Sequence, residues 1–184
     1  RLVLPKLSDI GSFIYNGFGM GSEHIFDAVV MLVFNTLLLR FGGASGTLYV
    51  AIYGVIYTIS TIPIGVFDGA SDALLTVSAF LVGESDTDGI YTVLRKALSV
   101  VIVSGGIITL FSTAFSDAFI WFFGIRDPET IEIASVALRI FAINIVFMGV
   151  NMVITAFCQS IGRAKFAGAM TVIRDCILML VLGA

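Results

Sequence analysis

Three long stretches without a charged residue limit the fold of this chain more than any other feature. They cover 41–67, 97–116 and 140–162. About 20 apolar residues span the hydrocarbon core of a bilayer as an α-helix, and a helix satisfies its backbone hydrogen bonds internally. Each stretch reaches that length, and none shows the alternation of a transmembrane β-strand. The sequence therefore predicts an all-α, polytopic membrane helix bundle.

The composition excludes several other classes of protein. Of the 184 residues, 58% are hydrophobic and 12% are charged, and the mean hydropathy is +1.06. A soluble domain has about 25% charged residues, so this chain lacks the polar surface of a soluble enzyme or a nucleic-acid-binding protein. One histidine and two cysteines without metal-ligand spacing do not indicate a metal site or a disulfide. We expect no resident cofactor, no metal and no nucleic-acid partner.

The helices are separated by short connections near 42–46, 83–89 and 124–128, which are rich in glycine or contain proline. Pro63 predicts a kink, because proline removes one backbone hydrogen bond. We interpret residues 1–184 as a single transmembrane bundle of about five helices, over about 12–40, 46–82, 91–123, 129–161 and 165–184.

Lysine and arginine predict the orientation of these helices. Six of them lie at the start of the chain and in the loops near 83–96 and 162–165, whereas only Arg40 and Arg126 lie on the other side. Cytoplasmic loops carry an excess of positive charge. The group of six is therefore expected in the cytoplasm. As a separate expectation, the chain lies in the plasma membrane of a bacterial cell.

Glu23 and Asp27 are acidic residues within the first apolar helix, one turn apart on a face that also carries Asn16. A charge at bilayer depth costs at least about 2.5 kcal/mol and is by default a candidate functional group. Two nearby carboxylates also raise the pKa of at least one of them, which favours binding of a proton or sodium. Alternatively, they pair with Arg139 or Arg174, or line a wet cleft.

A polar stripe follows the predicted fourth helix. Asn144, Asn151, Thr155 and Gln159 lie within about 80° of one another around a helix. In lipid such a stripe turns inward, where it either joins helices by hydrogen bonds or lines a cavity. Hydrogen bonding between helices is the simpler role for a single residue, but the stripe as a whole favours a cavity wall.

Three tyrosines, Tyr49, Tyr53 and Tyr57, recur every fourth residue on the predicted second helix. An aromatic wall suits an amphipathic or cationic organic ligand, because cations bind the faces of aromatic rings. Packing in the core is the alternative role. We expect Tyr53 and Tyr57, together with Asn16 and Thr155, to line a cavity.

An acidic segment partly resembles the magnesium-binding signature of membrane CDP-alcohol phosphotransferases. It contains Asp68 and Asp72, and Asp86 follows in the next loop. Oxygen ligands on one helical face bind magnesium and a diphosphate. However, Ala73 and Leu74 stand where that signature requires arginine, so this enzyme is a minor alternative.

Several segments together resemble the second half of a multidrug and toxic compound extrusion (MATE) transporter. The segments are Asn35-Thr36-Leu37-Leu38-Leu39-Arg40-Phe41-Gly42-Gly43, Ile62-Pro63-Ile64-Gly65-Val66, Gly83-Glu84-Ser85-Asp86, Ala137-Leu138-Arg139-Ile140 and Cys158-Gln159-Ser160-Ile161-Gly162-Arg163. The resemblance implies twelve helices in two six-helix bundles. It also implies export of cationic or amphipathic compounds, driven by entry of sodium or protons.

The resemblance further implies a cation site in the second bundle, with one acid on its first helix and one on its fourth. Asp27 matches the first position better than Glu23. The second position falls near Val150 or Asn151, where no acid stands, although the Asn151 side chain carries a neutral oxygen. We therefore expect ion coupling or substrate contact at Asp27, Glu23, Asn151 and Asn144.

Five helices are fewer than the six of one bundle. We expect the chain to be a fragment or a split gene product whose partners are the missing first half, membrane lipids and a small organic cation. One alternative is a lipid-linked oligosaccharide flippase of the same superfamily, whose cavity is basic, whereas the deep charges here are mostly acidic. Another is a non-catalytic membrane subunit, in which the polar stripes only join helices.

Overall fold

The computed structural model describes residues 28–172, and every secondary-structure element in that range is a helix. The predicted all-α membrane bundle is confirmed. In chain order the elements are a helix over Ala28–Phe41, the short 3-10 helix η1 (Gly43–Ser45), and the α-helices α2 (Gly46–Gly83), α3 (Thr87–Ala114), α4 (Ser116–Phe122), α5 (Pro128–Ser160) and α6 (Ala164–Val172).

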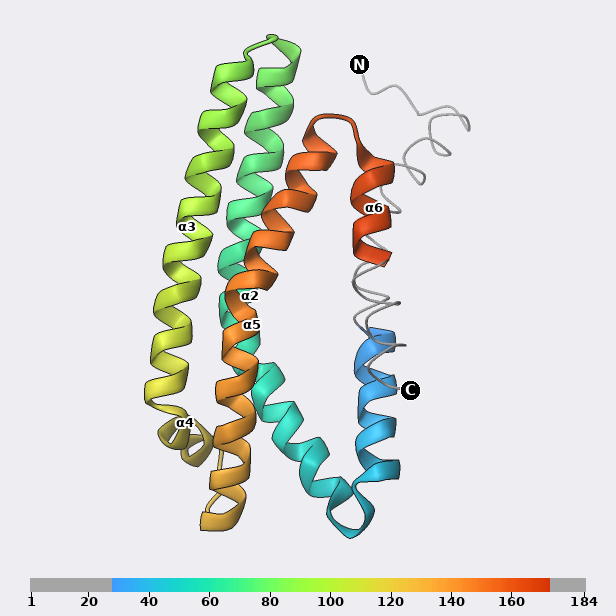
Figure 1. Ribbon diagram of the computed structural model, residues 1–184, viewed down its shortest axis with the longest axis vertical. Helices are drawn as coiled ribbons and strands as arrows, with labels where there is room; N and C mark the ends of the chain where they lie inside the picture. The colour runs from blue at the N-terminus through green and yellow to red at the C-terminus, as the bar shows by residue number, and fades with distance from the viewer. Residues whose placement is uncertain (1–27, 173–184) are drawn as a thin grey trace, which may run out of the picture.

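Three long helices, α2, α3 and α5, form the body of the molecule (Figure 1). The turn between α2 and α3 lies at the upper end of the view, and α4 leads into α5 at the lower end, so α3 is antiparallel to both α2 and α5, which are parallel to each other. Each is long and apolar enough to cross a membrane, over Gly43–Gly83, Thr87–Ala114 and Pro128–Ser160. The helix Ala28–Phe41 and α6 lie beside this body.

Aspartate side chains cap the N-termini of two of the long helices, α3 and α5. Asp86 accepts a hydrogen bond from the Gly89 amide at 2.9 Å, so α3 starts at Thr87 rather than near the predicted residue 91. Asp127 accepts hydrogen bonds from the side chain and the amide of Thr130, at 2.6 and 3.0 Å. These two bonds hold the pKa of Asp127 below its usual value.

Phe67 of α2 joins the three long helices in the middle of the body. Its side chain is fully buried and packs in a cluster with Val101 of α3 and Ile145 of α5. Gly149 of α5 makes room for it, because a Cβ there would lie 2.9 Å from the Phe67 ring and would also clash with Val101. Close contact through a small residue is a common way for helices to pack in membranes.

The predicted helix over 91–123 is wrong in one respect, because the structure breaks it at Phe115. α3 ends at Ala114, and α4 begins at Ser116 and turns away from the axis of α3 (Figure 1). Serine and threonine side chains next to the break bond to the backbone, with Ser116 Oγ donating to the Thr113 carbonyl at 3.4 Å. Such local bonds compete with helix formation.

α2 bends about halfway along its 38 residues, between its lower and upper parts in Figure 1. Pro63 lies inside the helix and is buried. Since proline cannot donate the usual backbone hydrogen bond and its ring crowds the preceding turn, it accounts for the bend. The bend leads the first half of α2 toward the helix Ala28–Phe41.

Candidate functional site

The acidic residues expected to couple transport to an ion lie outside the described residues. These are Glu23 and Asp27, and Asn16 on the same predicted face lies outside them too. The remaining candidates, on α2 and α5, are in the described part.

The polar stripe of α5 changes exposure along its length. Asn144 is exposed, Asn151 is half-buried and Thr155 is buried. The Thr155 hydroxyl donates to the Oδ1 atom of Asn151 at 3.4 Å. An amide oxygen has two lone pairs, so Oδ1 of Asn151 keeps one acceptor position in addition to the one that Thr155 uses.

The tyrosines of α2 belong to an aromatic row that continues onto the preceding helix. The ring centroids of Tyr53 and Tyr57 are 6.3 Å apart, and those of Tyr53 and Phe34 are 4.7 Å apart. Phe34 and Tyr57 are each more than a third exposed. The row of Phe34, Tyr53 and Tyr57 is therefore an aromatic surface that is partly open, and not only core packing.

Sequence reasoning missed Phe34, although a signal was present. The turn at Gly43 joins two helices that run in opposite directions, and Phe34 and Tyr53 lie at nearly equal distances before and after it. Residues at similar distances from a short turn face each other across an antiparallel helix pair.

The aromatic row and the polar stripe lie in different halves of the bundle. Near the tyrosines, Ile56 packs in a cluster with Leu138 of α5. Near Asn151, Val153 packs in a second cluster with Phe67 of α2. Tyr57 and Phe67 are about 15 Å apart along the axis of a helix. The structure thus brings Asn151 together with Thr155, and Tyr53 together with Tyr57, as two separate groups of candidate residues.

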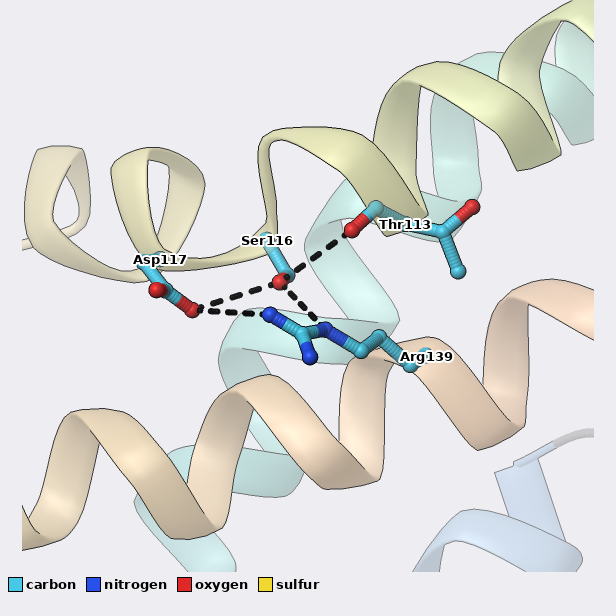
Figure 2. Close-up of polar contacts among 4 residues, drawn as sticks. All are labelled: Thr113, Ser116, Asp117 and Arg139. Atoms are coloured by element: carbon cyan, nitrogen blue, oxygen red, sulfur yellow. Dashed lines mark hydrogen bonds and ion pairs between the residues drawn. The ribbon is translucent and has the colours of Figure 1, made fainter.

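An ion pair joins α4 to α5 next to the break after α3. Figure 2 shows the Arg139 side chain reaching from α5 toward two residues at the start of α4. Its Nε donates to the Ser116 hydroxyl at 2.8 Å, and its Nη2 lies 3.4 Å from Oδ1 of Asp117. Among residues 28–172, Asp117 is the ion-pair partner of Arg139, while the acids of the predicted first helix lie outside the described residues.

The environment of Asp117 favours its charged form. The hydroxyl of Ser135 is the largest cause that lowers the pKa of Asp117, and Ser116 and Arg139 lower it further against the opposing effect of burial. Ser135 Oγ is buried without a hydrogen bond of ordinary geometry.

Sequence reasoning did not pair Asp117 with Arg139. The two residues lie at the same distance from Pro128, one before it and one after it. Pro128 begins α5 directly after the turn at 123–127, so Asp117 lies nearer to the reversal of the chain than Arg139 does. Each also borders one of the uncharged stretches.

The acidic residues of the phosphotransferase alternative do not gather into a metal site. Within the described range, no group of three or more His, Cys, Asp or Glu side chains is arranged to hold a metal ion. Asp86 caps the N-terminus of α3, where its side chain accepts a hydrogen bond from the Gly89 amide. Asp72 lies on α2, about three helical turns before the end of that helix at Gly83.

Comparison with known proteins supplies the family. Residues 24–184 match the family described as MatE, over a range that includes every described element. Comparison with curated proteins and with solved structures gives no significant match. Because the match covers most of the sequence and the fold is a bundle of long apolar helices, the chain belongs to the MATE family, which is a family of membrane transporters.

Proposed function

We propose that this chain is part of a secondary-active antiporter that exports organic cations or amphipathic drugs in exchange for sodium or protons. Membership of a transporter family and three helices of membrane-spanning length support transport in general. The aromatic row carries the proposal on substrate class. The membrane is the plasma membrane of a bacterial cell, and the partner is the first half of the transporter.

The aromatic row has the chemistry that an organic cation needs. A cation over an aromatic face gains about 0.5–1 kcal/mol at an exposed site and about 2 kcal/mol or more when desolvated. Three rings from two helices stand in succession, at 4.7 and 6.3 Å between centroids. A flat or bulky cation contacts more than one ring at this spacing, and none of the three rings carries a charge that would select against it.

Ion coupling rests on the resemblance of the sequence and on the chemistry of α5. We propose Asp27 as the main coupling acid, with Glu23 beside it and Asn144 and Asn151 as polar contacts for the ion or the substrate. The second acceptor position of Asn151 Oδ1 supports this role, because hard cations bind neutral amide oxygens as well as carboxylates. Thr155 holds that oxygen at 3.4 Å. Coupling needs no resident cofactor.

The pairing of Arg139 favours an exporter of cations over an oligosaccharide flippase. A flippase requires basic groups that are available to a diphosphate. Arg139 is occupied by Ser116 and Asp117. Its positive charge is thus offset by the carboxylate, which weakens any attraction for an anionic substrate.

Binding of a lipophilic cation tests the aromatic row. In the full-length transporter reconstituted in liposomes, we expect Tyr53→Ala to weaken tetraphenylphosphonium binding about fivefold to tenfold, from the loss of one ring contact. Tyr53→Phe keeps the ring and should bind like the wild type. Tyr91→Ala is the matched control, because Tyr91 is 66% exposed on α3 and belongs to no aromatic pair in the described range. Unchanged binding by Tyr53→Ala would remove the aromatic row from the substrate path.

A further inference from the structure

One face of α3 carries a hollow that the proposed transport function does not use. The hollow is shallow and open, and all of its lining residues belong to α3: Thr92, Arg95, Lys96, Ser99 and Val100. Most of these residues follow one another at helical spacings of three and four, so they share a face. The buried face of α3, with Ala97, Val101 and Gly105, lies opposite. The hollow therefore opens away from the bundle.

The hollow is cationic. Arg95 and Lys96 are both exposed, and neither forms an ion pair with any residue in the range 28–172. The two hydroxyls beside them already donate to the helix backbone, Thr92 to the Asp88 carbonyl and Ser99 to the Arg95 carbonyl, each at 2.8 Å. The guanidinium and the ammonium group are thus the free donors, and together they suit a phosphate.

The position of the hollow along α3 matches the depth of lipid headgroups. The uncharged stretch 97–116 begins directly after Lys96 and ends directly before Asp117. The part of it that lies in α3, residues 97–114, measures about 27 Å at 1.5 Å per residue, close to the roughly 30 Å thickness of the hydrocarbon core. Arg95 and Lys96 therefore lie at the level where a bilayer places its phosphates.

Below the hollow, the same face of α3 is apolar and open. Val103, Ile107 and Leu110 follow at spacings of three and four residues and are 60%, 52% and 67% exposed. Along one helix face, positive charge thus gives way to an apolar stripe that extends toward the centre of the bilayer. An anionic phospholipid has the same order of groups, with a phosphate at the surface and acyl chains beneath it.

We propose that this face of α3 binds an anionic phospholipid. The phosphate contacts Arg95 and Lys96, and one acyl chain lies along Val103, Ile107 and Leu110. Each basic residue near a membrane surface adds about fivefold to the affinity for anionic lipid, or about 30-fold for two. This site is separate from the aromatic row, so it stands or fails independently of the transport proposal.

Native mass spectrometry of the purified chain tests the site, with dioleoyl phosphatidylglycerol and dioleoyl phosphatidylcholine as probes. We expect the wild type to prefer phosphatidylglycerol, and the double variant Arg95→Gln/Lys96→Gln to lose that preference by about 30-fold. The variant Arg40→Gln/Arg126→Gln removes two positive charges near the other end of the bundle and should keep the preference. Circular dichroism confirms that each variant is helical.

Three results would overturn the proposal. The first is an unchanged preference in Arg95→Gln/Lys96→Gln, and the second is an equal loss in Arg40→Gln/Arg126→Gln, which would indicate general attraction to positive charge. The third is displacement of phosphatidylglycerol by an equal concentration of glycerol 3-phosphate, which would show that the hollow binds a free phosphate rather than a lipid. Retained preference in Lys96→Arg, in contrast, would support a site defined by charge.

Discussion

The two ends of α3 meet the membrane with charged residues, but they use them differently. At one end, Arg95 and Lys96 are exposed and form no ion pair with a described residue. At the other end, Asp117 on α4 is paired with Arg139 on α5 (Figure 2). The uncharged stretch 97–116 separates the two groups by about the thickness of a hydrocarbon core.

This difference shows that a charge at a membrane boundary either serves the fold or remains available to ligands. The Arg139 contacts connect α5 to the start of α4, next to the break at Phe115. Arg95 and Lys96 form no ion pair with a residue of 28–172, which is one basis of the proposed lipid site. Whether a charged residue has this structural role thus depends on its neighbours in the fold and not on its residue type alone.

The largest expected effect on stability comes from a substitution in the core cluster around Phe67, which packs α3 against α2 and α5. Phe67→Ala removes a fully buried ring between α2, α3 and α5. We expect it to lower the free energy of unfolding by about 3–5 kcal/mol, measured by denaturant titration in detergent micelles. Phe147→Ala is the control, because Phe147 is 69% exposed on α5. Equal effects of the two substitutions would contradict the assigned core.

Arg139→Gln removes the ion pair between α5 and α4 and should lower the free energy of unfolding by less than Phe67→Ala does. It removes the 2.8 Å hydrogen bond to Ser116, whose hydroxyl lies in a buried residue, as well as the contact with Asp117. Since Arg139 is about half exposed, we expect a loss of about 1 kcal/mol. Arg40→Gln removes an exposed arginine with no ion-pair partner in the described range and should change the stability by less. An equal or larger loss in Arg40→Gln would argue against the pair.

The smallest expected effect is a dependence of stability on pH that arises from the carboxyl group of Asp117. Because the folded state lowers the pKa of Asp117 from 3.8, the carboxylate contributes stability above the unfolded pKa. That contribution disappears as the pH falls through the lower folded pKa. Thermal unfolding in detergent below pH 4 should therefore show a shallower pH dependence for Asp117→Asn than for the wild type. Parallel curves would show that Asp117 has no favourable partners in the fold.

Much of the fold was predictable from local sequence signals. α2 covers Gly46–Gly83 where the sequence predicts 46–82, because uncharged residues fill its first part and glycine-rich turns flank it. The break at Phe115 was not predictable in the same way. No glycine or proline marks it, and the hydrogen bonds of Ser116 that accompany it include one to Arg139, a distant residue in the sequence.

The candidate site was predictable only within single helices. Tyr53 with Tyr57, and Asn151 with Thr155, are one helical turn apart, so helical periodicity brings each pair together. Phe34 with Tyr53, and Asp117 with Arg139, come from different helices. Their contacts depend on how two helices pack, which composition and periodicity do not specify. Distance from a turn indicated only Phe34 with Tyr53.

Efflux by the full-length transporter in liposomes tests the proposed function most directly. Tetraphenylphosphonium export is measured with an imposed sodium or proton gradient and without one, for the wild type and for Asp27→Asn. We predict that the wild type exports the cation only with a gradient and that Asp27→Asn loses this gradient-driven export. Gradient-driven export that is unchanged in Asp27→Asn would contradict the role of Asp27, and absence of export by the wild type would contradict the proposed antiporter.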